Sequence, residues 1–150
     1  MKAEEYKNVI SFAVENEIEA YEFYQGVCEK TSDSNLKAIF KELADEEKKH
    51  RNFLEGLLSR PSAFHFDEAK DYKISEAVDK PKLTLSMKPA DAIALAMKNE
   101  EEAMQMYSDL ADASSNAEQK QMFESLSRME RGHKAKLENI YTNIAFPEVW

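Results

Sequence analysis

The sequence repeats itself once, at an offset of 83 residues and without a gap. Aligning positions 8–58 with positions 91–141 gives 15 identities in 51 pairs, far above the chance level. A repeat of this length is typical of a duplicated supersecondary unit. The chain is therefore expected to fold as two copies of one motif.

Apolar residues recur every three or four positions in each copy, which predicts two helices per copy. The first copy gives helices over residues 4–30 and 34–58, and the second gives a matching pair within residues 89–143. Short polar segments separate the helices of each pair, and Ser115 with Glu118 has the spacing of a capping box for the fourth helix. Each copy is therefore expected to form an antiparallel helical hairpin.

Residues 59–88 join hairpin 4–58 to hairpin 89–143. A helix of about 25 residues is about 38 Å long, and the connecting segment can span that length even if it contains a turn or a short helix. The three glycines and four prolines are too few for a fold with many tight turns. We predict one all-α domain over residues 1–150: an antiparallel four-helix bundle of two duplicated hairpins joined by a long crossover.

Composition excludes several classes of protein. The net charge of -9 argues against nucleic-acid binding, which requires clustered basic residues. No apolar run approaches the length of a membrane span. The residues after Met1 are acidic where a signal peptide is apolar, and the single Cys28 cannot form an internal disulfide. A cytoplasmic location is expected.

Each predicted helix carries one glutamate inside its apolar stripe. These residues are Glu17, Glu47, Glu100 and Glu130. The two members of each pair are equidistant from the turn of their hairpin, so they face each other at the same height. All four carboxylates are therefore expected near the middle of the bundle.

A histidine follows the second glutamate of each pair by three positions, as His50 and as His133. Side chains three positions apart lie on the same face of a helix, about one turn from each other. Each Glu-x-x-His unit can therefore offer a carboxylate and an imidazole to the same point. Two such units at matched positions of the repeat favour a shared site over two solvated surface pairs.

Four buried carboxylates without compensating charge would cost several kcal/mol each. No lysine or arginine occupies a matching inward position. Carboxylate oxygens together with imidazole nitrogens suit divalent iron or manganese, and four carboxylates neutralise two divalent cations. The sequence therefore predicts a dinuclear metal site with six protein ligands and coordination positions left free for water, dioxygen or peroxide.

Neighbouring residues leave alternatives open. Glu46 could replace Glu47 as a ligand, but its counterpart in the repeat is Met129, so Glu47 is preferred. Tyr24 and Tyr107 lie two turns beyond the first glutamate of each copy, on the same helix face. They either pack in the core, or their hydroxyls hold the ligand carboxylates by hydrogen bonds across the bundle or donate electrons during turnover.

The ligand pattern is similar to that of the ferritin-like dinuclear carboxylate proteins, which place one glutamate on each of two helices and Glu-x-x-His on the other two. Within that group, the segments 17–24 (EIEAYEFY) and 40–50 (FKELADEEKKH) resemble the erythrin domain of the rubrerythrin family. The resemblance covers nearly the whole chain except the crossover. It implies a ferritin-like bundle that holds two iron ions, with manganese or zinc as alternatives, and that frequently forms a homodimer.

The resemblance also implies an oxidoreductase that reduces hydrogen peroxide or dioxygen. Rubrerythrins receive electrons through a rubredoxin module whose iron needs four cysteines, whereas this sequence has one. Electrons would therefore need an external donor of the rubredoxin type. Their additional third-helix glutamate is Ala103 here, and Lys48 stands where bacterioferritin has its haem-binding methionine, so haem is not expected. The alternatives are a ferroxidase or iron-binding protein without peroxidase turnover, and a structural bundle with zinc or no metal.

Overall fold

Four long helices make up most of the computed structural model, which describes residues 2–60, 64–69 and 82–143. They are α1 (Ala3–Lys30), α2 (Ser34–Ser59), α3 (Pro89–Ala113) and α4 (Ala117–Asn143). Each boundary that the repeat and the apolar periodicity predicted is met to within about one residue. The all-α prediction is confirmed, while the assignment of the whole chain to one domain stays a prediction.

Polar side chains of the two turns cap the N-termini of α2 and α4. Asp33 caps α2, because its side chain accepts hydrogen bonds from the amides of Asn35 and Leu36. The capping box expected at Ser115 and Glu118 was wrong. Asn116 takes this role, since its Oδ1 accepts a hydrogen bond from the Gln119 amide at 3.0 Å.

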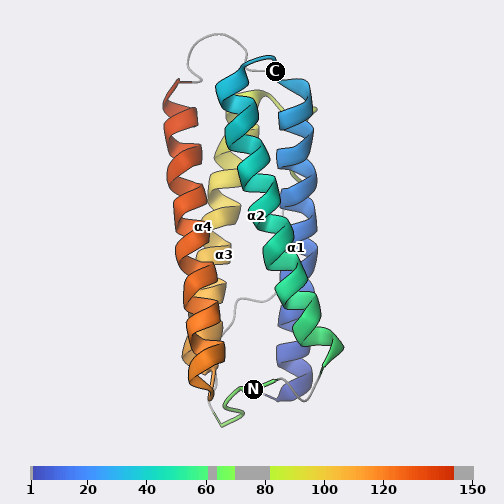
Figure 1. Cartoon of the computed structure of the whole chain (residues 1–150), viewed down its shortest axis with the longest axis vertical. Coiled ribbons are helices and arrows are strands. Elements are labelled where there is room, and N and C mark those ends of the chain that lie inside the picture. Colours follow the sequence, from blue (N-terminus) through green and yellow to red (C-terminus); the bar gives the residue numbers. More distant parts are fainter. Residues whose placement is uncertain (1, 61–63, 70–81, 144–150) are drawn as a thin grey trace.

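The helices run up, down, down and up along the bundle (Figure 1). The α1–α2 turn and the start of α3 lie at one end, while the end of α2 and the α3–α4 turn lie at the other. The crossover therefore has to travel the length of the bundle. Each helix packs closely against the other helix of its own hairpin, and side chains of α1 contact α3 while those of α2 contact α4.

The described parts of the crossover pack against the bundle at two places. Phe66 stacks on Tyr6 with ring centroids 4.2 Å apart and forms an isolated bridge with Ser114. Leu85 lies against Gly26, whose missing side chain lets the two segments approach. The other crossover residues, 61–63 and 70–81, lie outside the described residues.

Two apolar clusters fill the two halves of the bundle. One, near the α1–α2 turn, includes Phe40 and Ile93. The other, near the α3–α4 turn, includes Ile10 and Phe123. The glutamates and histidines singled out by the sequence belong to neither cluster and are all buried, so they form a polar layer between two apolar ones. Among the described helices, none has an apolar stretch long enough to cross a membrane.

Candidate metal centre

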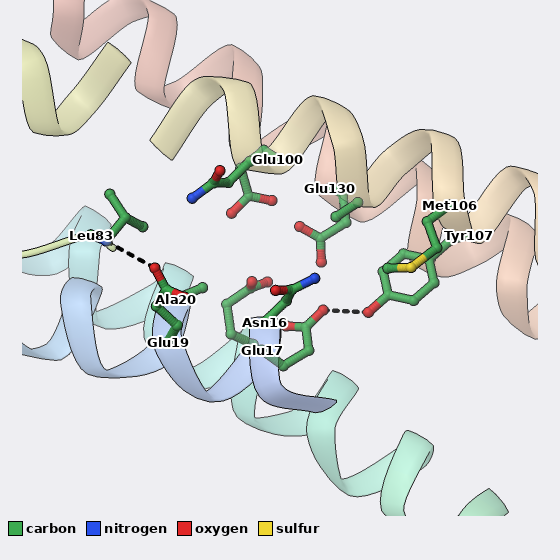
Figure 2. Close-up of a pocket in the computed structure, with 12 residues that line it drawn as sticks. Asn16, Glu17, Glu19, Ala20, Leu83, Glu100, Met106, Tyr107 and Glu130 are labelled. Carbon is green, nitrogen blue, oxygen red and sulfur yellow. Dashed lines mark hydrogen bonds between the residues drawn. The ribbon is translucent and has the colours of Figure 1, made fainter. Parts of the chain in front are cut away.

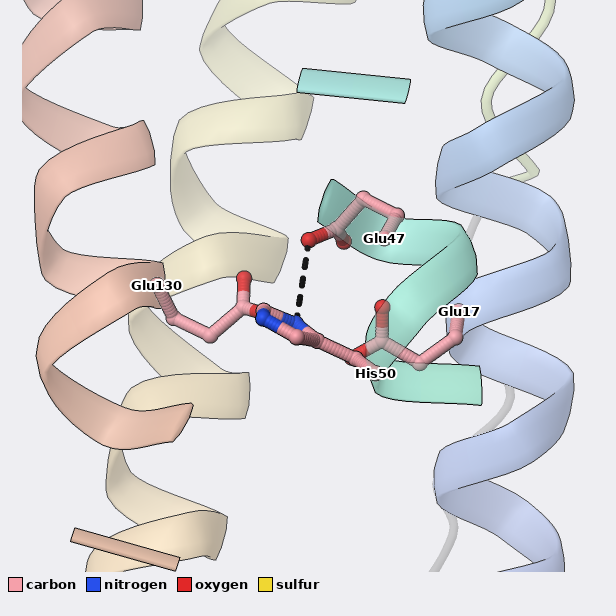
Figure 3. Close-up of side chains that lie close together, drawn as sticks. All are labelled: Glu17, Glu47, His50 and Glu130. Carbon is pink, nitrogen blue, oxygen red and sulfur yellow. Dashed lines mark hydrogen bonds and ion pairs between the residues drawn. The ribbon is translucent and has the colours of Figure 1, made fainter. Parts of the chain in front are cut away.

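The bundle brings all six predicted ligands together at mid-height. Glu17, Glu100 and Glu130 converge from three helices in Figure 2, and Figure 3 shows Glu47 and His50 of α2 beside two of them. The sequence placed these residues by their distance from the turns, and the structure brings every one of them to the common layer. Their meeting follows from helix periodicity and hairpin geometry alone.

The six side chains form two overlapping groups. In each group, one ligand atom from each residue lies within 4.8 Å of those of the others. The first group contains Glu17, Glu47, His50 and Glu130, and the second contains Glu47, Glu100, Glu130 and His133. Two carboxylates are thus common to both groups, while each group has its own glutamate and histidine. Such an arrangement can hold two cations with shared bridging carboxylates.

Both histidines turn the same ring nitrogen toward the carboxylates. Nδ1 of His50 lies 2.7 Å from Oε1 of Glu130 and 3.4 Å from Oε1 of Glu47. Nδ1 of His133 lies 3.0 Å from Oε1 of Glu47 and 3.6 Å from Oε2 of Glu130. The two rings are nearly parallel, with centroids 5.9 Å apart. Each group therefore receives one imidazole donor from its own side.

Several inward atoms of this layer are buried but make no well-aligned hydrogen bond to another described residue, although Nδ1 of His133 lies 3.0 Å from Oε1 of Glu47. They are Oε2 of Glu17, Oε1 of Glu47, Oε2 of Glu100, Oε2 of Glu130 and Nδ1 of His133. Buried polar groups in native proteins are almost always satisfied. Carboxylate oxygens and, once deprotonated, imidazole nitrogens that converge on two points are the donors that divalent iron or manganese binds. The donor set therefore fits two metal ions.

In the absence of metal, protons bound to the histidines supply the positive charge of the polar layer. Burial lowers the pKa of both imidazoles, but hydrogen bonds with carboxylates outweigh it and raise the pKa to about 12 for His50 and to about 11 for His133. Burial raises the pKa of Glu17 and, more strongly, of Glu47, and the charge of Glu130 adds to this. For Glu130, burial is outweighed by its hydrogen bonds with both histidines, which lower the pKa to about 2.

These pKa values predict that metal and protons compete. At pH 7, below the pKa of both imidazoles, each ring carries an extra proton that must leave before Nδ1 can bind metal. We expect about two or more protons to be released when both positions fill, so that the overall two-metal binding constant rises about 100-fold or more per pH unit near neutrality. Calorimetric titrations with manganese in buffers of different ionisation enthalpy measure this release. Binding without proton release at pH 6 to 8 would contradict it.

The two tyrosines hold carboxylates across the bundle. Tyr24 of α1 donates a hydrogen bond to Oε1 of Glu100 on α3, and Tyr107 of α3 donates one to Oε1 of Glu17 on α1, both at 2.5 Å. Burial raises the pKa of both phenols well above 10, and nearby carboxylate charges add to this, so the hydroxyls keep their protons and donate. Tyr24 and Tyr107 also belong to the two apolar clusters, so the contacts match both the core-packing and the hydrogen-bonding interpretations left open by the sequence.

Replacing Tyr24 or Tyr107 with phenylalanine should leave a buried carboxylate oxygen without its donor. We expect the free energy of unfolding to fall by about 1–3 kcal/mol and metal affinity to fall by about 10-fold or more. Tyr6→Phe is the matched control, because Tyr6 is a buried α1 tyrosine whose hydroxyl bonds to the carbonyl of Asp67 instead. Metal titration and thermal unfolding of the three variants separate the two effects. Equal metal affinity in all three variants would contradict the role of Tyr24 and Tyr107 in holding the ligand carboxylates.

Glu46 is a site residue whose part the sequence did not reveal. It is not in either ligand group, and Glu47 occupies the inner position as preferred. The Glu46 carboxylate instead contacts Nε2 of His133, the nitrogen facing away from the shared carboxylates. The signal available in the sequence was an acidic residue beside a ligand where the repeat has Met129.

A cavity of about 20 Å³ adjoins the carboxylates on the side of α1 and α3 (Figure 2). That volume accommodates about one water-sized molecule. Ala20 and Ala103, which occupy matching positions of the repeat, are part of its wall. Leu83 of the crossover closes part of the same wall and is held there by a 2.8 Å hydrogen bond from its amide to Glu19. No pattern in the sequence predicted this contact.

Comparisons with known proteins agree with this geometry. Residues 8–141 match the profile of the rubrerythrin family. A hypothetical protein from Pyrococcus furiosus of known structure is 31% identical, with 91% of this chain and 87% of that chain covered at a TM-score of 0.72. A Thermotoga maritima protein described as ferritin-like and diiron-carboxylate is 21% identical, with 95% of each chain covered at a TM-score of 0.73. A search of curated proteins finds no match.

The profile match spans α1 to α4 and includes all six residues of the polar layer. The likeness to the Thermotoga maritima structure concerns the fold and confirms a ferritin-like four-helix bundle. The family resemblance inferred from the segments 17–24 and 40–50 is confirmed as well. The chain belongs to the rubrerythrin family.

Proposed function

We propose that this protein binds two iron ions in the polar layer and reduces hydrogen peroxide or dioxygen with electrons from an external donor. The observation that carries this proposal is the convergence of buried carboxylate and imidazole atoms, several of them without a well-aligned hydrogen bond, on two neighbouring points. Membership of the rubrerythrin family supports iron over other metals that accept the same donors.

Each side chain has a defined part in this proposal. Glu47 and Glu130 belong to both ligand groups and would help to hold both ions. Glu17 with His50, and Glu100 with His133, would complete the coordination of one ion each. Iron held this way supplies one-electron redox chemistry at each of two adjacent ions, so the pair can deliver two electrons.

The protein around the layer would control access and protons. The apolar clusters on both sides would keep bulk water away, since their core residues are buried. The cavity beside Ala103 offers space for one small molecule next to the carboxylates. Reduction of one hydrogen peroxide to two waters consumes two electrons and two protons. Protonated Tyr24 and Tyr107 orient the carboxylates of Glu100 and Glu17 while this happens.

The electron donor is proposed to be a separate redox protein of the rubredoxin type. A rubredoxin iron needs four cysteine ligands, whereas the sequence contains only one cysteine. That cysteine, Cys28, is buried in the apolar cluster near the α1–α2 turn, away from the polar layer. Electrons would therefore have to enter from outside the bundle.

Stopped-flow oxidation of the anaerobic, iron-loaded protein tests this function. We expect visible absorbance to develop faster with one equivalent of peroxide than with air, and steady peroxide consumption once a rubredoxin-type donor and its reductase are added. Glu47→Gln is the inactive control, because it removes a shared carboxylate. Oxidation mainly by air, followed by uptake of further iron, would instead establish a ferroxidase. Iron that stays ferrous with both oxidants would reject both functions.

A further inference from the structure

The two histidines differ at the nitrogen that faces away from the shared carboxylates. Nε2 of His133, on α4, contacts the carboxylate of Glu46, which reaches across from α2 and is 22% exposed. Nε2 of His50 is buried and has no hydrogen-bond partner among the described residues. The repeat explains the difference, since the position equivalent to Glu46 is Met129, whose thioether is only a weak acceptor.

The rest of the site is closely matched between the two halves. Glu47 and Glu130 belong to both groups, so they favour neither. The remaining glutamate of each group accepts a 2.5 Å hydrogen bond from a tyrosine of the other hairpin. The histidines present the same nitrogen inward. The contact between Glu46 and His133 is therefore the main chemical difference between the two positions.

We propose that Glu46 makes the two metal positions unequal, so that the position beside Glu100 and His133 fills first and binds more tightly. An imidazole that binds metal through Nδ1 keeps its proton on Nε2. Glu46 accepts a hydrogen bond from that proton in His133, which fixes the tautomer and the orientation of the ring. In His50 the same proton would be buried without an acceptor, which weakens binding at the position beside Glu17.

Removing a carboxylate that orients a metal-binding histidine typically lowers metal affinity by about 10–100-fold. That factor sets the expected separation between the two dissociation constants of this protein. The inference rests on the proposed function only in that two divalent ions bind to the layer. It makes Glu46 a positioning residue, because it acts through His133.

An anaerobic calorimetric titration of the metal-free protein with ferrous iron tests whether the two positions differ in affinity. We expect two steps whose dissociation constants differ by about 10–100-fold. Glu46→Met, which copies the other half of the repeat, should weaken the tight step until the two steps merge. Glu46→Gln should keep most of the separation, because its amide oxygen can still accept the hydrogen bond. Glu42→Met is the matched control, since Glu42 lies one turn earlier on α2 and also pairs with α4, through Lys136 at 3.0 Å.

Two further variants assign the steps to positions. His133→Ala should abolish the tight step, and His50→Ala should abolish the weak one. Two equal steps in the unaltered protein, the opposite assignment, or the same titration for Glu46→Met and Glu42→Met would overturn the inference while leaving the proposed function in place. Absence of any iron binding by the unaltered protein would overturn both. Circular dichroism of each variant checks that the helices are intact.

Discussion

Replacing either shared glutamate should cost the protein both metal ions, whereas replacing an unshared one should cost only one. Glu47 and Glu130 are members of both ligand groups, while Glu17 and Glu100 are each members of one. We expect the iron content of anaerobically loaded, desalted protein to fall from about two per chain to near zero in Glu47→Gln and Glu130→Gln. In Glu17→Gln and Glu100→Gln it should fall to about one.

The amide of glutamine keeps the shape of the side chain but removes its charge, so these variants test the electrostatic role and preserve the packing. Glu42→Gln is a suitable control because Glu42 lies on the same helix as Glu47 but is exposed and belongs to neither group. Inductively coupled plasma mass spectrometry gives the metal-to-protein ratio. The same loss of iron in all four variants, or none in any, would contradict the division into shared and unshared ligands.

Removing the metals should lower the melting temperature by on the order of 20 °C. Ligand at about 1,000 times its dissociation constant stabilises a protein by about 4 kcal/mol per site. A domain of this size shifts by about 2–4 °C for each kcal/mol. Without metal, the negative charge of the buried carboxylates is offset only by protons bound to the glutamates themselves and to His50 and His133. Thermal unfolding in chelator and in excess ferrous iron or manganese, both anaerobic, measures the difference.

The Glu47→Gln variant sharpens this test because it should remove the stabilisation by metal without lowering the stability of the metal-free protein. It should lose the stabilisation by metal, since it loses both ions. Its metal-free form should melt at the same temperature as the metal-free parent or higher, because a neutral amide replaces a carboxyl whose pKa is raised by burial. A variant that gained as much stability from metal as the parent would show that the metals bind elsewhere.

The positions of the six ligands could be predicted because they depend only on regular geometry. A repeat with one offset fixed the pairing of the helices, and the apolar stripe fixed the face that turns inward. Within that stripe a glutamate or histidine is conspicuous by its chemistry. Glu17 and Glu47 then meet because both are the same distance from one turn.

The contacts that were missed depend on information that periodicity does not contain. The link between Glu46 and His133 depends on which helices of different hairpins are neighbours and on the rotamers of two long side chains. The cap of α4 moved to Asn116 because the amide of Ser115 bonds to the carbonyl of His65 in the crossover. The hydrogen bond from the Leu83 amide to Glu19 likewise depends on the path of an irregular segment.

The most direct test of the central claim, that the polar layer is a two-iron centre, is anomalous diffraction at the iron absorption edge. Crystals grown without oxygen and soaked in ferrous iron should show two peaks per chain in this layer. One should lie beside Glu17 and His50, the other beside Glu100 and His133, and both should contact Glu47 and Glu130. Peaks only at the protein surface, or none within the bundle, would contradict the claim.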